Sequence, residues 1–274
     1  MPCQSAAAMV RAAFAGGYAV PALDIETCDM AEAVLAAAER ARTPLIVQIT
    51  PRTLDRLGWR WLSRHLRDLC DAAPLPVALH LDHATSVEAA LRGLDHGFTS
   101  VMYDGSHLPP DENARNTAAV AEAARRAGAS VEGEIGHVGR DGEPPGLDHL
   151  TTADEARAFA AATGVDFLAV AVGTRHGHSP GPGGIDLRRL EEIRDVASVP
   201  LVLHGGSGVP DAQLRAAIAR GIAKVNVGTA LNRAYMGAVD AAAPAPRDVV
   251  ERAMAAVGAE AERVFALTGS AGAA

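Results

Sequence analysis

Three histidines each stand at the end of a short apolar run, where their side chains could share one ligand. They are His83 in "HLDHA", His176 in "GTRHG" and His204 in "LHGGSG". A lone histidine is more often a core or surface residue, but three imidazoles with an open fourth position commonly hold a catalytic zinc ion. At the open position the ion polarises a substrate carbonyl or activates water. The three histidines therefore predict a catalytic Zn²⁺ site, provided that the fold brings them together.

An acidic residue precedes the first of these histidines. Asp82 is adjacent to His83 and could act as a base beside the metal. It could instead cap the helix that begins in "DHATSVEAA", but Thr85 or Ser86 could cap that helix equally well, which leaves Asp82 for proton transfer. His80, two residues earlier, could face the same interior and support the site.

The residues after His204 predict an anion-binding loop. "GGSG" (205–208) leads into a helix near Pro210, and "NVGT" (226–229) leads into another. Glycines let backbone N–H groups approach an anion closely, and a helix N-terminus adds a favourable dipole. One such loop is a moderate signal, but two after neighbouring strands predict a phosphate site. A ligand that reaches both this site and the metal would be a small phosphorylated carbonyl compound.

These residues need a scaffold that brings distant strand ends together. Eight short apolar runs alternate with alanine-rich amphipathic stretches, which is typical of a (β/α)8 barrel. A doubly wound open sheet is the alternative, but it usually carries a glycine fingerprint after its first strand, and "YAVPALDIE" has none. We therefore predict one (β/α)8 barrel domain over residues 1–274, with an extra helix after Ala245. The expected strands are 18–23, 44–50, 76–81, 98–103, 130–135, 166–172, 200–204 and 222–227.

The barrel matters because the chemistry of this fold lies at the C-terminal ends of its strands. Acid, base or metal-ligand side chains stand at most of the predicted strand ends. They are Asp24, Asp82, His83, Asp104, Glu134, Arg175, His176, His204 and Asn226.

Composition narrows the classes of partner and location. The net charge is −8 with no block of like charge, which argues against a nucleic-acid partner and against a basic membrane-binding face. No run approaches the ~18 apolar residues of a membrane span. The three cysteines form no CxxC pair, which fits a reducing compartment. The N-terminus lacks the basic region of a signal peptide. We therefore expect a cytoplasmic enzyme.

Taken together, these motifs resemble the class II, metal-dependent ketose-bisphosphate aldolases, which include fructose-bisphosphate and tagatose-bisphosphate aldolases. The resemblance runs from about Tyr18 to Ala230. Its blocks occur in the family's order: "HLDHA", "SVMYDGSHLPPDENARNT", "SVEGEIGHVG", "GVDFLAVAVGTRHG", "VPLVLHGGSGVPD" and "GIAKVNVGT". Together they are highly specific, although "GGSG" or "DH" alone would not be.

The resemblance implies a lyase of carbohydrate metabolism, as in glycolysis, that reversibly cleaves a ketose (bis)phosphate. The products would be dihydroxyacetone phosphate and an aldehyde, by default glyceraldehyde 3-phosphate. His83, His176 and His204 would bind one catalytic Zn²⁺, and Asp82 would exchange a proton with the substrate's C4 hydroxyl. Asp104 and Glu134 would lie near the metal and help to hold a second or displaced ion.

The resemblance also implies a donor-binding site and an assembly. A monovalent cation, Na⁺ or K⁺, would accompany the phosphate, and the protein would be a homodimer or homotetramer. The residues implied to hold dihydroxyacetone phosphate are Gly177, Gly205, Gly206, Ser207, Asn226, Val227, Gly228 and Thr229.

The chain departs from the family around the substrate more than around the metal. Asp24 stands where the family usually has asparagine, and it would place a negative charge near the donor. "TPRTLDRLGW" replaces a phosphate-contacting stretch, with Arg52 as a possible substitute. Gly142 stands where the family's catalytic loop glutamate aligns, so Glu143 or Asp141 would have to replace that glutamate.

Two other functions stay open at this stage. The altered loop is compatible with a non-catalytic homologue that binds sugar phosphates. A zinc-dependent hydrolase is less favoured, because such barrels often carry an HxH pair on the first strand and this chain has no histidine there. The residues are compatible with more than one aldehyde and with either the fructose or the tagatose configuration.

Overall fold

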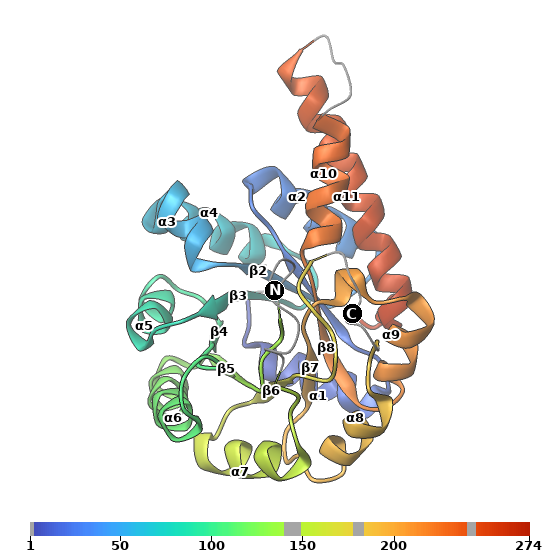
Figure 1. The fold of residues 1–274 in the computed structure, drawn as a ribbon. Helices are drawn as coiled ribbons and strands as arrows, with labels where there is room; N and C mark the ends of the chain where they lie inside the picture. Colours follow the sequence, from blue (N-terminus) through green and yellow to red (C-terminus); the bar gives the residue numbers. More distant parts are fainter. Residues whose placement is uncertain (1–2, 140–148, 178–183, 240–244) are drawn as a thin grey trace.

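Eight parallel strands close into a barrel in the computed structural model, which describes residues 3–139, 149–177, 184–239 and 245–274. Each strand pairs with the next along the chain, and β8 returns to β1 (Figure 1). The strands are β1 Val20–Asp24, β2 Leu45–Ile49, β3 Val77–Ala84, β4 Ser100–Tyr103, β5 Ser130–Ile135, β6 Phe167–Val170, β7 Leu201–Leu203 and β8 Ile222–Val227. The predicted (β/α)8 barrel is confirmed, and every expected strand lies within two or three residues of an observed one.

Helices surround the barrel and connect its strands. They are α1 Ala6–Gly16, α2 Cys28–Ala41, α3 Pro51–Leu57, α4 Trp59–Ala72, α5 Val87–Asp95, α6 Pro110–Ala127, α7 Ala153–Thr163, α8 Leu187–Arg194, α9 Asp211–Ile218, α10 Thr229–Val239 and α11 Pro246–Thr268. Local sequence fixes several of their ends. Thr152 and Glu155 form a capping box at the start of α7, and Ser86 caps α5 through its hydroxyl.

Side chains alternate along each strand between two environments. Outward residues such as Leu79, Leu203 and Val225 pack under the helices in one large hydrophobic cluster. Inward residues at the lower end of the barrel form a second, smaller cluster that includes Ile46, Phe167 and Val202. Above this apolar floor the interior turns polar. Gln48, His80, Asp82, Ser100, Glu132, Glu134, His204, Lys224 and Asn226 are all buried there.

Two irregular strands explain part of that polar interior. The pairing of β3 with β4 shifts register between Leu81 and Ala84, and His83 there has a φ of 49°. Because residues alternate sides on a regular strand, consecutive side chains cannot both face the interior without such an irregularity. The shift therefore brings both Asp82 and His83 to the barrel mouth. A second shift, opposite Leu201 and Val202, lies on β8 just before Lys224.

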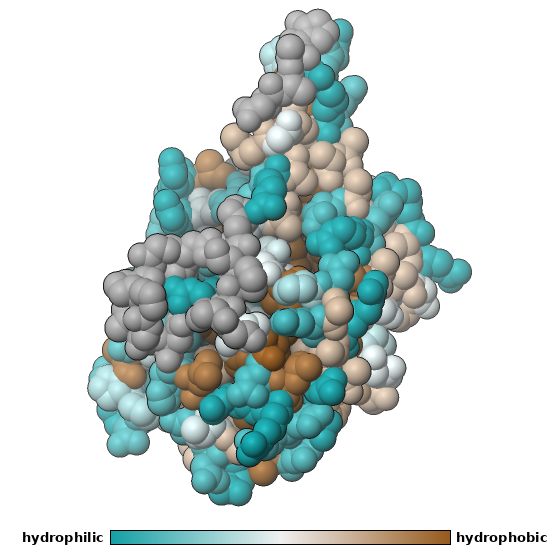
Figure 2. All heavy atoms as spheres, turned by 45° about the vertical axis from the view of Figure 1, so that its right-hand side comes forward, coloured by the Kyte–Doolittle hydropathy of each residue, from teal (hydrophilic) through white to brown (hydrophobic). Residues whose placement is uncertain are grey.

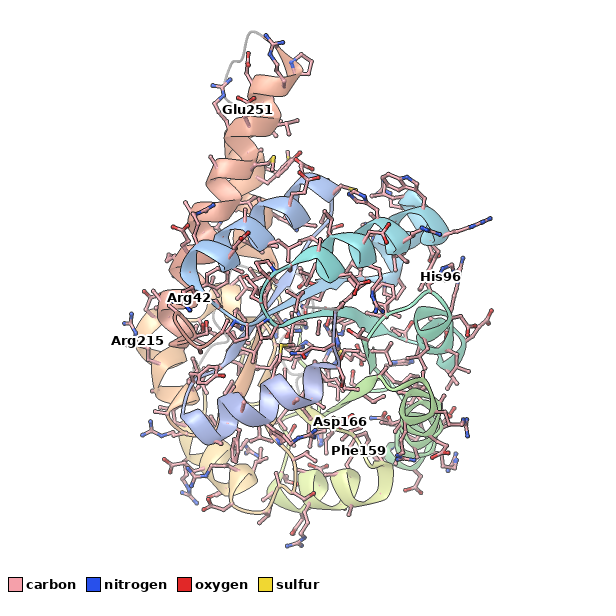
Figure 3. The ribbon with its side chains drawn as sticks, turned by 180° about the vertical axis from the view of Figure 1, so that it is seen from behind. Arg42, His96, Phe159, Asp166, Arg215 and Glu251 are labelled. Atoms are coloured by element: carbon pink, nitrogen blue, oxygen red, sulfur yellow. The ribbon has the colours of Figure 1, made fainter. Side chains whose placement is uncertain are left out.

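The first helix lies across the N-terminal end of the barrel, as the view from behind shows (Figure 3). Its inner face supplies Ala6, Met9, Val10 and Ala13 to the smaller hydrophobic cluster. Arg11 on this helix lies 3.5 Å from Asp166, the residue that precedes β6. This helix is not predictable from its sequence pattern, because an alanine-rich stretch with one arginine has little amphipathic character.

The C-terminal helix is long and extends beyond the barrel. α11 packs along α2 and α10, and its N-terminal half projects with α10 as an arm (Figure 1). The space-filling view shows the same arm standing clear of the barrel (Figure 2). The predicted extra helix after Ala245 is therefore confirmed. Among the described residues, no helix has both the length and the apolar character needed to cross a membrane.

Candidate metal centre and active site

The structure brings His83, His176 and His204 together at the barrel mouth. A ring nitrogen of each lies within 4.8 Å of a ring nitrogen of the other two. Nε2 of His83 and Nδ1 of His204 are 3.1 Å apart. Their rings meet edge to face, with centroids 4.8 to 5.6 Å apart.

Two buried carboxylates orient two of these histidines. Nδ1–H of His83 donates to Asp104 at 2.8 Å, and Nε2–H of His204 donates to Glu132 at 2.7 Å. A histidine whose one nitrogen donates to a carboxylate presents the lone pair of its other nitrogen to a metal. The free nitrogens are therefore Nε2 of His83 and Nδ1 of His204, the same two atoms that lie 3.1 Å apart.

These donors fit a tetrahedral metal ion. Zinc–nitrogen bonds of 2.0–2.1 Å in tetrahedral geometry place two ligand nitrogens about 3.3 Å apart. The 3.1 Å separation is close to that spacing. A second group of possible ligands shares His83 and adds Asp104 and Glu134. Oε2 of Glu134 is buried and makes no hydrogen bond among the described residues, as expected for a ligand atom whose partner is an ion.

Burial and neighbouring charges shift the pKa values of these side chains in different directions. Burial alone would lower the pKa of His83, but Asp82, Asp104 and Glu134 together raise it to about 10. Burial lowers the pKa of His204 well below its usual value, and the nearby charge of His83 lowers it further. Burial, reinforced by Asp104, raises the pKa of Glu134 to about 8. In the metal-free protein, His83 is therefore the protonated member of the pair and His204 the neutral one.

Asp82 lies beside the histidines and faces the interior. Its Oδ2 is 3.7 Å from Nε2 of His83, and its Oδ1 accepts a hydrogen bond from Asn226 at 3.2 Å. Because Ser86 caps α5, Asp82 is not needed as the cap. A carboxylate here can accept a proton from a hydroxyl of a substrate that also reaches the histidines.

A small pocket adjoins the histidines. It is lined by Asp24, His176, Gly177, Gly205, Ser207, Asn226, Gly228 and Thr229. Gly205 has a φ of 70°, and a Cβ there would lie 2.3 Å from the carbonyl oxygen of Arg175, so this turn requires glycine. The hydroxyl of Ser207 accepts a hydrogen bond from the backbone of Ala230, which joins the loops that follow β7 and β8.

Most of the predicted donor-binding residues thus meet in one pocket, but two do not line it. Val227 directs its side chain into the outer hydrophobic cluster, because it follows Asn226 on a strand. Gly206 is buried beneath the loop, where a Cβ would contact Val225 and the backbone of Asn226. The predicted loop acids Glu143 and Asp141, with Gly142, lie outside the described residues.

Asp24 lies in the same pocket, in surroundings that oppose a negative charge. Its side chain enters the pocket, where a Cβ on Gly228 would lie 2.8 Å from its carboxylate. Burial raises the pKa of Asp24 well above its usual value, and the charge of Asp82 raises it further. This environment favours the neutral acid, which can donate a hydrogen bond as an asparagine amide does. The negative charge expected of Asp24 therefore stays a prediction, and burial together with Asp82 opposes it.

Sequence reasoning missed two buried charged residues below the histidines. Glu132 and Lys224 form a completely buried ion pair of 2.7 Å, and Glu132 also accepts the hydrogen bond from His204. Two signals could have found them. Glu132 lies two residues before Glu134 and so faces the same side of the strand. Lys224 is the only lysine in the sequence.

Comparisons with known proteins agree with this geometry. Residues 4–273 match the family described as class-II fructose-bisphosphate aldolase. The chain is similar to the YdjI aldolase of Escherichia coli K12, with 31% identity, a TM-score of 0.89 and 99% of each chain covered. It is also similar to a putative fructose-1,6-biphosphate aldolase of Coccidioides immitis, with 32% identity, a TM-score of 0.91 and 98% of each chain covered.

A more distant structure supports the fold alone. The fructose-bisphosphate aldolase of Campylobacter jejuni shares 21% identity with this chain, with a TM-score of 0.82, over 98% of this chain and 96% of the other. The family match spans nearly the whole sequence and includes every residue of the histidine cluster and its pocket. This chain belongs to the class-II fructose-bisphosphate aldolase family.

Proposed function

We propose that this aldolase is zinc-dependent and reversibly cleaves a ketose phosphate to dihydroxyacetone phosphate and an aldehyde, with glyceraldehyde 3-phosphate as the aldehyde. The observation that carries the proposal is the joint position of three features. Three histidine nitrogens converge, Asp82 lies beside them, and the glycine-lined pocket opens next to His176. A ligand with a carbonyl and a phosphate a few ångström apart would reach all three.

His83, His176 and His204 would hold the metal ion. A bound divalent ion would supply a Lewis acid for the carbonyl and hydroxyl oxygens of the ketose. Asp82 would take the proton from the C4 hydroxyl as the carbon–carbon bond breaks. The hydrogen bond from Asn226 would keep the Asp82 carboxylate turned toward that hydroxyl.

The phosphate would bind where the loops after β7 and β8 meet. Backbone N–H groups at Gly205 and at the start of α10 can approach an anion there, and the dipole of α10 favours negative charge. The hydroxyl of Ser207 accepts from Ala230 and still has its own proton to donate. A monovalent cation, Na⁺ or K⁺, beside the phosphate belongs to the same proposal. Binding the phosphate would position the reacting carbons without taking part in bond making.

The aldehyde half and the proton donor to carbon belong to the proposal as well. Glu143, or Asp141, would protonate the donor carbon from the loop after β5. Asp24, which lines the pocket, would contact the donor ketone.

The proposal extends to the protein's assembly and location. We propose a homodimer or homotetramer, supported by Met236 and Val250, which are 54% and 37% exposed on the projecting arm. Large exposed apolar side chains on such an arm fit a protein interface. We propose a cytoplasmic location from the three free cysteines, which fit a reducing compartment.

Replacing one histidine tests the proposal. His204→Ala should lose tight zinc binding and the condensation of dihydroxyacetone phosphate with glyceraldehyde 3-phosphate. His65→Ala is the matched control, because His65 lies on α4, stacked on Trp61 and remote from the cluster. If His204→Ala keeps both zinc and activity at the level of the control, the proposal is wrong.

A further inference from the structure

The single lysine of this chain, Lys224, is completely buried. The sequence has 25 lysine and arginine residues, and Lys224 is the only lysine among them. Its side chain is completely buried inside the barrel, although most of the arginines whose ion pairs are described lie at the surface. Burying an ammonium group is costly unless its partners compensate. A chain that uses arginine everywhere else and lysine only here indicates a specific requirement for lysine at this position.

Lys224 contacts two different polar groups. Its Nζ lies 2.7 Å from Oε2 of Glu132 and donates a 2.6 Å hydrogen bond to Oδ1 of Asn226. The shift of register on β8 just before Lys224 and the alternation that follows place both Lys224 and Asn226 on the inner side of the strand. Two routes of hydrogen bonds therefore start at the ammonium group. One runs through Glu132 on β5, and the other runs through Asn226 toward the barrel mouth.

The first route leads to a candidate metal ligand. One oxygen of Glu132 pairs with Lys224, and the other accepts Nε2–H of His204 at 2.7 Å. Both Glu132 and His204 are completely buried, so bulk solvent does not compete for these bonds. Holding the proton on Nε2 leaves the lone pair of Nδ1, the nitrogen that lies 3.1 Å from His83.

The second route leads to the candidate base. An asparagine amide has an accepting oxygen and a donating nitrogen that are hard to distinguish unless their partners fix them. Lys224 can only donate, so its contact fixes the oxygen of Asn226 on that side. The amide nitrogen then points the other way and donates to Oδ1 of Asp82 at 3.2 Å. The orientation of Asp82 thus depends on the same ammonium group.

We propose that Lys224 is a positioning residue that sets the ligand nitrogen of His204 through Glu132 and the carboxylate of Asp82 through Asn226. The inference rests on the proposed metal centre. Arginine would not serve, because its planar guanidinium is larger than an ammonium group and spreads its donors over a fixed fork. A compact ammonium group can instead reach a carboxylate and an amide oxygen from one atom.

The first test is metal affinity, measured on full-length protein by competition with a chelator of known zinc affinity. Lys224→Met and Glu132→Gln should each weaken zinc binding about 10- to 100-fold, the usual effect of losing an orienting partner. The double variant should bind zinc at most about threefold more weakly than whichever single variant binds zinc less tightly, because both changes break one chain of contacts. Val131→Ala is the matched control, a buried residue beside Glu132 that faces the outer cluster.

The second test needs no variant. Protein labelled with ¹⁵N-lysine should give one side-chain ammonium resonance by NMR, since there is only one lysine. That resonance should be protected from solvent exchange and should shift when zinc is added, although Lys224 is not itself a ligand. Protein labelled with ¹⁵N-histidine should show a protected Nε2–H on His204, weakened in Glu132→Gln. These signals remain decisive if Lys224→Met does not fold.

Three results would overturn the inference. Zinc affinity of Lys224→Met within threefold of Val131→Ala would show that Lys224 does not act on the metal ligands. A loss of zinc affinity in the double variant equal to the product of the two single losses would show that Lys224 and Glu132 act separately. An ammonium resonance that does not respond to zinc would show that the two sites are uncoupled. Failure of the proposed aldolase reaction is distinguishable, because zinc-loaded wild-type protein would then bind metal as described and yet leave dihydroxyacetone phosphate unchanged.

Discussion

Raising the pH from 7 to 9 should tighten zinc binding to the metal-free protein by at least about 100-fold. The reason is the proton on His83, whose pKa is raised to about 10 by Asp82, Asp104 and Glu134 against the effect of burial. A metal ion must displace that proton before it can bind Nε2. The proton is held at pH 7 and is lost as the pH rises toward 10, so affinity increases with pH over this range.

The size of the effect follows from the distance between the pH and the pKa. At pH 7, three units below a pKa of about 10, roughly one molecule in 1,000 carries neutral His83. Displacing the proton therefore costs about 4 kcal/mol of binding free energy, and each added pH unit recovers about tenfold in affinity. Glu134, with a pKa of about 8, loses its own proton in the same range and adds to the increase.

Two measurements check this prediction. Chelator competition across pH 7 to 9, corrected for protonation of the chelator, should give a slope of at least one in log affinity against pH. Calorimetry at pH 7 in two buffers of different ionisation enthalpy should show at least one proton released per zinc bound. Asp104→Asn removes a negative charge beside Nδ1–H of His83, which should lower the pKa of His83 and let zinc affinity level off at a lower pH.

An affinity that stays flat between pH 7 and 9 would refute this reasoning. A histidine with an ordinary pKa near 6.5 gives such a flat profile, because it is already neutral above pH 7. The same conclusion would follow if no proton were released on zinc binding at pH 7.

Three further predictions concern single residues. Asp82→Asn should retain zinc but lose about 10²- to 10⁴-fold in aldol cleavage, measured by steady-state kinetics, and near-normal turnover would exclude Asp82 as the base. Gly205→Ala should lower the melting temperature and abolish calorimetric binding of dihydroxyacetone phosphate, because its Cβ would meet the Arg175 carbonyl at 2.3 Å; unchanged binding would place the phosphate elsewhere. Gly133→Ala should cost about 1–3 kcal/mol in urea unfolding, because its Cβ would lie 2.8 Å from Phe159, and should leave zinc affinity unchanged. A loss of zinc affinity in Gly133→Ala would show that the helix layer and the metal centre are coupled.

The sequence was sufficient for the barrel because its signals are local and repeated. Each predicted strand is a short apolar run with an observed counterpart, and Ser86, one of the two caps offered for the helix after Asp82, does cap it. The helix α1 was missed because its apolar residues face the barrel floor without a polar face that contrasts strongly with them.

The candidate site was predictable in its residue types but not in its connections. The motifs identified His83, His176 and His204, and their strand-end positions follow from the barrel. The partners of these histidines were not predictable, because Glu132 and Lys224 contact each other across the barrel from strands 92 residues apart. The raised pKa of Asp24 also depends on its burial and on Asp82, which spacing alone does not show.

Proton exchange into dihydroxyacetone phosphate tests the central claim most directly, because it needs no choice of aldehyde. Zinc-loaded protein would be incubated with this ketone in D2O and the C–H signals followed by NMR, with and without a chelator. We expect stereospecific loss of one C–H signal, which the chelator abolishes. Zinc-loaded protein that leaves the C–H signals unchanged would contradict the proposal that this chain is a zinc-dependent aldolase acting on dihydroxyacetone phosphate.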